Sequence, residues 1–485
     1  MTGSFWPLVA ASLAWLVPAG LALIAIAGAA PQRVWRSALG AIAAISLGVL
    51  AFFLAGFAIA FGGIGLIQPD VAGFDELVWE WSLMGSEWGP QWGTAGLAGW
   101  ALAKAAATPD AYNLFFSQLP WVATATMIPL IALRGRTAVL SSLLGGILVG
   151  GLLYPLATNW VWGGGWLANL GYTANLGHGF VDFAGAGTVH LVGGAVALAG
   201  LLTMVDRRAG KPAEPTRGVN LPPVQLPVLA SVGAFLVLAG SVAWSWANPL
   251  LNENTLWSSR GAVNVILVAL AGALLPLAYT WFVANRSDAL MAARGLAAGA
   301  VAGAAIGPFV APWAALVLGA VVGLLVPLLT YLVREVLRVE DDTGILPVHL
   351  TGGLAGLIAL GFLADGLTGR GWNDVGVASY LGVAGQGVTG LMVAEGMQSD
   401  WPGQMLAQLL GMTALFLVPF LAATLVFGPL AVLIKGLDQR PRSGQSPTVE
   451  PAMQATTISV ADLQTADNPT EFQSDHDEIH SSVHQ

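Results

Sequence analysis

A chain of 485 residues with 56% hydrophobic and only 9% charged residues cannot cover a water-facing surface, because soluble proteins carry about 25% charged residues. The C-terminal tail contributes much of the formal net charge of −9, and the chain has no basic patch suited to nucleic acid. The absence of cysteine excludes disulfides, thiolate metal sites and a cysteine nucleophile. The surroundings of most of this chain must therefore be lipid.

Eleven apolar runs are long enough to cross a bilayer, for which a helix needs about 20 residues. They lie at 6–30, 38–66, 115–133, 138–160, 183–205, 224–248, 261–283, 289–307, 309–333, 345–365 and 403–434. No Lys or Arg precedes the first run, and Arg33 and Arg36 follow it, which is the reverse of a signal peptide. We therefore predict an all-α polytopic membrane protein in the cell membrane, with its N-terminus outside.

The positive charges test this count. With the N-terminus outside, 15 of the 18 Lys and Arg residues fall in cytoplasmic segments, and the other three are Lys104, Arg260 and Arg370. The positive-inside rule expects such a bias, and one miscounted span would spoil it. Within the long outer segment, the apolar stretch 93–107 is interpreted as a short helix that does not span.

Two domains are predicted from composition. Residues 1–440 form the membrane domain, and residues 441–485 form a disordered cytoplasmic tail that is rich in Ser, Thr, Asp and Glu. The histidines of the tail are interpreted as solvated side chains rather than metal ligands: His476, His480 and His484.

A repeated motif is the most informative feature of the sequence. Asp182 and Asp341 each begin a span and are each followed eight residues later by a Val-His-Leu-x-Gly-Gly sequence that contains His190 or His349. The spans run in opposite directions, so the motif predicts two five-helix inverted repeats plus a final helix. Eight helical residues place each histidine roughly 12 Å below its own surface, so the two can meet near the midplane.

Paired imidazoles at membrane depth favour function over packing, because ionisable groups there are costly and usually functional. Two neutral imidazoles can share a proton, hydrogen-bond a small N–H substrate or relay protons. A zinc site is disfavoured because two histidines alone leave zinc under-coordinated. Asp182 is expected to cap its helix, and its negative charge also favours a cation near the outer vestibule.

The stretch Asp182-Phe-Ala-Gly-Ala-Gly-Thr-Val-His190, the Trp160-Val-Trp162-Gly-Gly-Gly-Trp166 segment and the second histidine motif resemble the Amt/Rh ammonium transporter family over residues 1 to about 440. The resemblance implies a homotrimer in which each protomer has its own pore for ammonium or ammonia, with a cytoplasmic regulatory protein as a partner. No enzyme activity, cofactor or metal is expected.

The resemblance also assigns roles to particular residues. His190 and His349 match the twin pore histidines, and ammonium recruitment is implied for Trp162, Asn248 and Asp182. The aromatic gate matches Trp121 and Trp244, where the family usually has phenylalanine. The supporting residues are Gln118 and Tyr154.

Two alternative functions stay open at this stage. One is an ammonium sensor that conducts poorly, and the other is an Rh-like channel for a neutral gas. The histidine pair favours conduction over sensing, and the polar tail is too poor in core residues to be an output domain. Whether NH3 or NH4+ is the species transported also stays open.

Overall fold

A computed structural model of the chain describes residues 5–29, 34–84, 92–133, 139–205, 225–247 and 258–438. The α-helices are α1 (Phe5–Ala14), α2 (Leu16–Gly28), α3 (Val34–Ala51), α4 (Phe57–Phe61), α5 (Pro109–Leu133), α6 (Val139–Leu148), α7 (Tyr154–Val161), α8 (Leu170–Thr173), α9 (Val192–Met204), α10 (Gln225–Trp246), α11 (Ser258–Ala284), α12 (Ala289–Ile306), α13 (Pro312–Tyr331), α14 (Ile345–Leu363) and α15 (Gly403–Asp438). The short strands are β1 (Glu80–Ser82), β2 (Gly93–Gly96), β3 (Ser379–Tyr380) and β4 (Val383–Ala384).

Several helices continue through π-helical or 3-10 turns. The π segments are η2 (Phe52–Gly56), η8 (Val149–Leu153), η9 (Ala186–Leu191) and η12 (Leu332–Val336). The 3-10 segments are η3 (Ile64–Leu66), η4 (Ala72–Phe74), η6 (Trp100–Leu102), η7 (Lys104–Ala106), η11 (Gly307–Phe309) and η13 (Trp372–Asp374).

Eleven helical segments in the described part of the chain are long and apolar enough to cross a membrane, and each overlaps one predicted run. The all-α, eleven-span prediction is therefore confirmed. The largest difference is at the third span, which begins at Pro109 rather than at residue 115. The Thr108 hydroxyl explains the early start, because it accepts from the Ala111 N–H at 3.2 Å and caps the helix.

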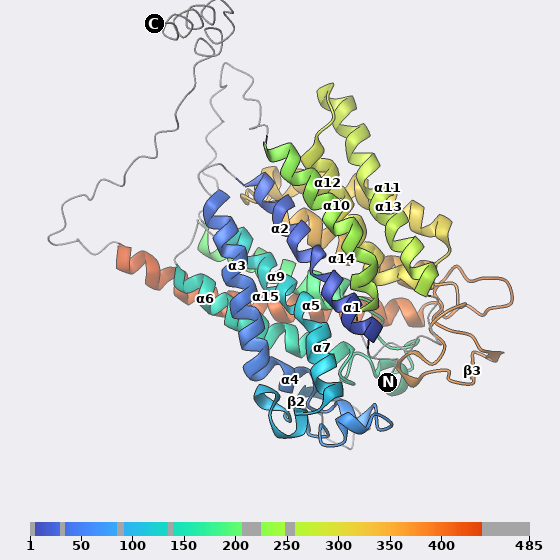
Figure 1. Cartoon of the computed structure of the whole chain (residues 1–485). Helices are drawn as coiled ribbons and strands as arrows, with labels where there is room; N and C mark the ends of the chain where they lie inside the picture. The colour runs from blue at the N-terminus through green and yellow to red at the C-terminus, as the bar shows by residue number, and fades with distance from the viewer. Residues whose placement is uncertain are drawn as a thin grey trace, which may run out of the picture. The chain divides into compact units, whose positions relative to one another are not determined.

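Close helix packing follows from small residues. Helices α2 and α10 lie side by side, as do α11 and α13 (Figure 1). A side chain on Gly20 of α2 would lie 2.4 Å from the carbonyl oxygen of Gly233 on α10, so this crossing requires glycine. Such close approach is how membrane helices gain packing energy where lipid offers no hydrophobic driving force.

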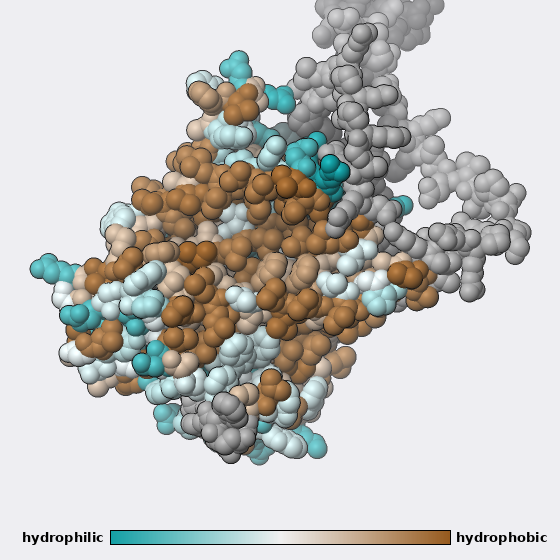
Figure 2. Space-filling model, turned by 180° about the vertical axis from the view of Figure 1, so that it is seen from behind, coloured by the Kyte–Doolittle hydropathy of each residue, from teal (hydrophilic) through white to brown (hydrophobic). Residues whose placement is uncertain are grey.

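The surface of the helix bundle is apolar over a broad area. Figure 2 shows hydrophobic residues spread across the face seen from behind, with polar residues gathered towards its ends. Exposed leucine, phenylalanine and tryptophan side chains on the spans contribute to it, such as Phe235, Leu274 and Leu425. A surface of this kind suits lipid and agrees with the low charge content.

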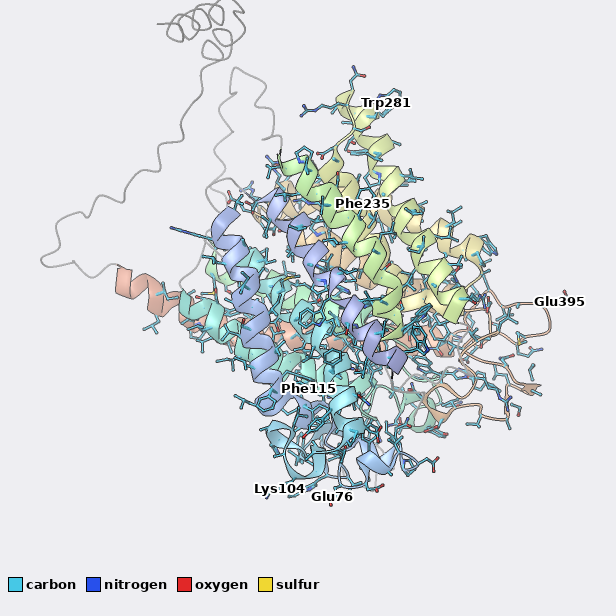
Figure 3. The ribbon with its side chains drawn as sticks, in the orientation of Figure 1. Glu76, Lys104, Phe115, Phe235, Trp281 and Glu395 are labelled. Carbon is cyan, nitrogen blue, oxygen red and sulfur yellow. The ribbon has the colours of Figure 1, made fainter. Side chains whose placement is uncertain are left out.

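The two ends of the bundle carry different segments. In Figure 3, Glu76 and Lys104 lie at one end, and Trp281 near the end of α11 lies at the other. The segment 93–107 is not the helix that was predicted: it forms strand β2 and two 3-10 turns, η6 and η7. Strand β2 instead pairs with β1, which satisfies its backbone groups, and Gly99 at φ +84° turns the chain before η6.

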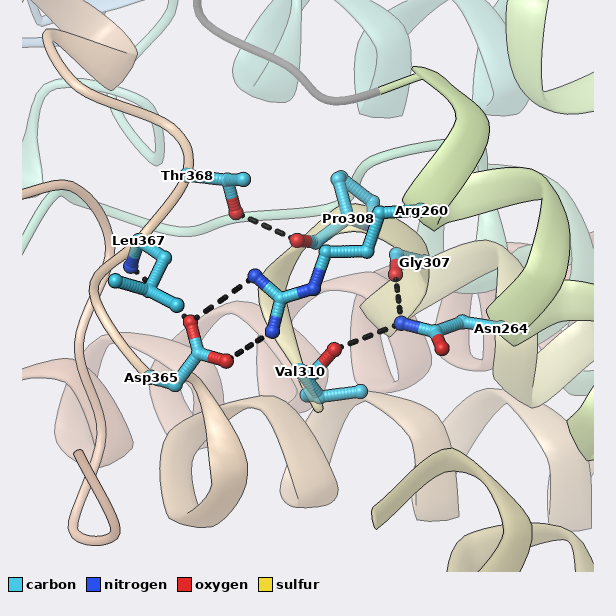
Figure 4. A network of polar contacts seen from close by, with 8 residues as sticks. All are labelled: Arg260, Asn264, Gly307, Pro308, Val310, Asp365, Leu367 and Thr368. Atoms are coloured by element: carbon cyan, nitrogen blue, oxygen red, sulfur yellow. Dashed lines mark hydrogen bonds and ion pairs between the residues drawn. The ribbon is translucent and has the colours of Figure 1, made fainter. Parts of the chain in front are cut away.

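A polar network fastens the start of α11 and the ends of α12 and α14 to one another (Figure 4). Arg260 forms a buried ion pair with Asp365, and the Asn264 amide donates to the carbonyl oxygens of Gly307 and Val310, at 2.7 Å each. The Thr368 hydroxyl donates to the Pro308 carbonyl oxygen at 2.6 Å. These bonds hold the loop after α14 against the start of α11 and the end of α12.

Candidate functional site

The two motif histidines are in direct contact. His190 lies in η9, before α9, and His349 lies in the second turn of α14. Their Nδ1 atoms are 3.0 Å apart, and the rings are nearly parallel, with centroids 5.0 Å apart and an interplanar angle of 6°. Both side chains are almost completely buried. One Nδ1 must donate and the other accept, so each Nε2 is left free to bond elsewhere.

An aspartate caps the start of each span that carries a histidine, as predicted. The Asp182 carboxylate accepts hydrogen bonds from the backbone N–H groups of Gly185, Gly187 and Thr188 at 2.8–3.1 Å. The Asp341 carboxylate accepts from those of Ile345 and Leu346 at 3.2 and 2.7 Å. These caps satisfy the free donors at the helix starts and fix the direction in which each histidine enters the bundle.

Burial acts on the charge of Asp182. It raises the pKa of the Asp182 carboxyl to about 6, although the hydrogen bonds from Thr188 and Gly187 lower it. Above that pH the carboxylate is ionised at the start of the span. A negative charge there attracts a cation towards the start of this span.

Three tryptophans continue the line of rings away from the histidines. The ring centroids are 4.9 Å apart for Trp162 and Trp121, 5.8 Å for Trp121 and Trp244, and 5.8 Å for Trp244 and His190. The five rings therefore form an unbroken series from Trp162 to His349, which we call the ring series. The rings lie close enough that a molecule passing between them must displace side chains.

Two of the indoles are anchored to the same short segment. Trp162 Nε1 donates to the Asp182 carbonyl oxygen and Trp244 Nε1 donates to the Ala184 carbonyl oxygen, both at 2.8 Å. Trp121 differs, since its buried Nε1 has no hydrogen-bond partner among the described residues. This donor is therefore available to a small polar molecule that enters between the rings.

The supporting residues lie beside the ring series. The Tyr154 hydroxyl donates to Gln118 Oε1 at 2.6 Å, and the Tyr154 ring packs against Phe52 at 5.9 Å. Gln118 lies on α5, one turn before Trp121, so this bond fixes the helix that carries the central indole. Asn248 lies outside the described residues, as do the histidines of the tail.

A small cavity lies between Trp244, His190 and helix α12. Its volume is about 10 Å³, and it is lined by Val17, Leu21, His190, Val237, Ser241, Trp244, Ala297, Ala300, Val301 and Ala304. A space of this size holds about one molecule as small as water. The space next to His190 is therefore narrow and mostly apolar.

No metal centre is evident in the part of the chain that the structure describes, where no group of three or more His, Cys, Asp or Glu side chains converges. The imidazole nitrogens at the site are those of His190 and His349. Their arrangement suits hydrogen bonding and proton transfer between imidazoles rather than metal binding.

A buried histidine outside the pair was not found by sequence reasoning. His178 is completely buried before the fifth span, and neither of its ring nitrogens has a hydrogen-bond partner among the described residues. Its ring lies 4.3 Å from that of Tyr380, in the loop after α14. It belongs to no repeated motif, so only the tertiary structure shows that it is enclosed.

His178 makes the stability of the protein depend on pH. Burial lowers its pKa from 6.5 to about 4, so the folded protein binds fewer protons than the unfolded chain between these values. Stability is therefore lost as the pH falls from about 6.5 towards 4, by about 2 kcal/mol at pH 5. We expect the melting temperature in detergent to drop between pH 7 and pH 5, and to drop less in His178→Gln. Equal drops in both proteins would contradict this assignment.

The chain is similar to known proteins in sequence and in fold. The sequence profile described as Ammonium Transporter Family matches residues 5–440. The ammonium transporter Amt2 of Archaeoglobus fulgidus is 31% identical over 366 residues, which cover 75% of this chain and 72% of that protein. A putative ammonium transporter of Synechocystis sp. is 30% identical over 66% of each chain.

Two solved structures share the fold. A structure titled Sensor Amt Protein superposes with a TM-score of 0.68 at 23% identity, covering 89% of this chain and 93% of that one. The crystal structure of Candida albicans Mep2 superposes with a TM-score of 0.63 at 19% identity, covering 90% of this chain and 84% of that one. At these identities the likeness is one of fold.

Proposed function

This chain belongs to the Ammonium Transporter Family, and on that premise we propose that it conducts ammonium or ammonia along the ring series from Trp162 to His349. It is a multi-pass membrane protein of a transporter family and not an enzyme. The observation that carries the proposal is the continuity of the ring series, which ends on two imidazoles in hydrogen-bond contact.

Each part of the ring series has a separate task. The face of Trp162 attracts a cation, and the carboxylate of Asp182 adds a negative charge nearby. Trp121 and Trp244 form the gate that the substrate displaces. Beyond the gate only a small, weakly hydrated species fits the cavity of about 10 Å³, which excludes hydrated potassium or sodium.

The histidine pair hydrogen-bonds the substrate and can move a proton. When one Nδ1 donates to the other, the donor ring keeps an unprotonated Nε2 and the acceptor ring keeps a protonated Nε2. The pair therefore offers one acceptor and one donor without a net charge. A proton added at one Nε2 shifts the shared proton between the Nδ1 atoms and leaves from the other Nε2.

The capture step is tested at Trp162. Trp162→Leu removes a cation-attracting face, so we expect the half-saturating concentration of methylammonium to rise about tenfold. Asn248→Ala should have a smaller effect of the same sign. The control is Trp166→Leu, because Trp166 packs against Trp92 and Trp160 and not in the ring series. If Trp162→Leu and Trp166→Leu change uptake equally, the capture site lies elsewhere.

Sensing is the second candidate function. The bulky Trp121–Trp244 gate and the small cavity behind it would slow conduction, and the Sensor Amt Protein shares this fold. A sensor would bind ammonium with little flux. An experiment with carbon dioxide distinguishes an Rh-like gas channel from the other two functions. When carbon dioxide is added to vesicles that contain a pH dye, only a gas channel would accelerate the acidification of their interior.

Assembly and domain organisation complete the proposal. We infer a homotrimer in the cell membrane, with residues 1–440 as the transporter domain and the N-terminus outside. Residues 441–485 would form a cytoplasmic tail, and a cytoplasmic regulatory protein is the partner that the family resemblance implies. Cross-linking of intact membranes followed by electrophoresis measures the trimer directly.

A further inference from the structure

One arginine lies on the same face of α12 as the residues that line the cavity. It is nearer to the end of the bundle that the charge bias assigns to the cytoplasm. Ala304, Val301 and Ala297 line the cavity beside His190, and they recur at spacings of three and four residues. Arg294 continues this series three residues before Ala297. On a helix, that spacing places its side chain on the same face, about one turn further inward.

Arg294 is enclosed at the inner end of this face, where the residue is only 6% exposed. One guanidinium nitrogen, Nη2, donates to the Asp342 carbonyl oxygen, and the buried Nε has no hydrogen-bond partner among the described residues. A positive charge is therefore held at low exposure just before the start of α14.

Two glycines on different helices make room for this side chain. A Cβ at Gly28, which ends α2, would lie 2.3 Å from Arg294 Nη2. A Cβ at Gly344, which precedes α14 with φ +71°, would lie 2.2 Å from Arg294 Nε. The guanidinium thus fills the gap between the ends of α2 and α14, and the same two helices contribute Leu21 and His349 to the pore.

The charge lies close to the histidine pair. Gly344 and His349 are five residues apart, a rise of about 7.5 Å along α14. A cation beside His349 would therefore be repelled across a distance of roughly 8–10 Å. At an effective dielectric constant of about 20, the guanidinium alone would slow the passage of a cation on the order of tenfold. The carboxylates of Asp288, Asp341 and Asp342 act on the same guanidinium and reduce this repulsion, so tenfold is the upper bound.

We propose that Arg294 is the inner gate of this pore, which closes the cytoplasmic end and admits an uncharged amine in preference to a cation. The inference rests on the proposed function and refines it by naming the exiting species. An N–H bond of ammonium breaks at the histidines, the proton bonds to an imidazole nitrogen, and NH3 leaves with the electron pair. The proton returns to the outer side. The guanidinium then swings towards the nearby carboxylates of Asp341 and Asp342 to let NH3 pass.

The charge of the gate is tested with three substitutions in reconstituted vesicles. Arg294→Met keeps most of the length and removes the charge, so the current per methylammonium taken up should rise by up to about tenfold. Arg294→Lys should keep the wild-type ratio, and Arg294→Ala should raise both current and uptake. The control is Arg334→Ala, which removes an exposed arginine just after α13 and should change neither. An unchanged ratio in Arg294→Met overturns the proposal.

The closure of the gate is tested without any transport. The chain contains no cysteine, so Ala297→Cys introduces a single thiol directly beyond Arg294. A membrane-impermeant thiosulfonate reagent applied to the cytoplasmic face should modify this thiol about tenfold faster when Arg294 is also replaced by alanine, because thiol reactivity depends on access. Arg294→Lys with Ala297→Cys should stay slow, because lysine keeps a long, charged side chain at this position.

Equal modification rates in the Ala297→Cys variant and in the variant that combines it with Arg294→Ala would overturn the gate. This outcome is distinct from failure of the proposed function, because thiol modification requires a folded pore but no ammonium flux. If the wild-type protein does not transport and the thiol is nevertheless shielded by Arg294, only the transport proposal fails.

Discussion

Replacement of either pore histidine by alanine should abolish selective ammonium uptake while the protein still folds. Positioned proton-transfer groups contribute about 100-fold or more to rates, so we expect His190→Ala and His349→Ala each to reduce selective uptake by about that factor. The remaining imidazole is left without its 3.0 Å partner, which costs roughly 1–3 kcal/mol. A bundle with eleven packed spans should tolerate that loss and assemble.

The two histidines should act as one unit. The double variant is expected to transport about as fast as the less active of the two single variants, because losing either ring already removes the shared proton. His178→Gln is the matched control, since it removes a completely buried histidine that lies outside the pair. Initial rates of methylammonium uptake, scaled to folded protein, measure the effect. Wild-type rate and selectivity in both single variants would make the pair structural.

Asp182→Ala should prevent the fifth span from folding correctly. The carboxylate accepts three backbone N–H bonds and lies 3.2 Å from the Thr188 hydroxyl oxygen, all in a fully buried position. Leaving these three buried backbone donors unpaired costs roughly 1–3 kcal/mol for each, so a total loss of about 3–9 kcal/mol is expected. The backbone at 182–184 would then move, so its carbonyl oxygens would no longer hold the indoles of Trp162 and Trp244 in place.

The melting temperature and the yield of folded protein in detergent measure this loss. Asp341→Ala is the matched comparison, because Asp341 caps α14 in the same way but is only partly buried and accepts two backbone bonds. It should therefore lose less stability than Asp182→Ala. Asp182→Asn should fall between wild type and alanine, since an amide keeps the shape but accepts fewer hydrogen bonds. Equal melting temperatures for Asp182→Ala and Asp341→Ala would refute this account.

The spans and the histidine contact could be predicted from sequence because each depends on a strong pattern. A run of about 20 apolar residues has few alternatives to a membrane helix. The contact between His190 and His349 joins positions 159 residues apart, yet the inverted repeat implied it through equal depth from opposite surfaces. The aspartate caps followed from their positions at the heads of the spans.

Other features could not be predicted because they depend on packing between distant segments. The stretch 93–107 is apolar without strict periodicity, and its pairing with β1 decided against a helix. The sequence identified Arg294 only as one of the positive charges on the cytoplasmic side. Its burial could not be predicted, because it depends on Gly28 and Gly344 lying against the same guanidinium. The order of the tryptophans was implied by family resemblance, while their spacing required coordinates.

One measurement tests the central claim that the ring series conducts ammonium or ammonia: simultaneous recording of uptake and current in reconstituted vesicles under an inward ammonium gradient. The account predicts saturable uptake by the wild-type protein well above that of protein-free vesicles. It also predicts loss of that uptake in the folded His190→Ala, His349→Ala double variant. Wild-type uptake at the level of empty vesicles, despite ammonium binding, would contradict conduction and identify a sensor.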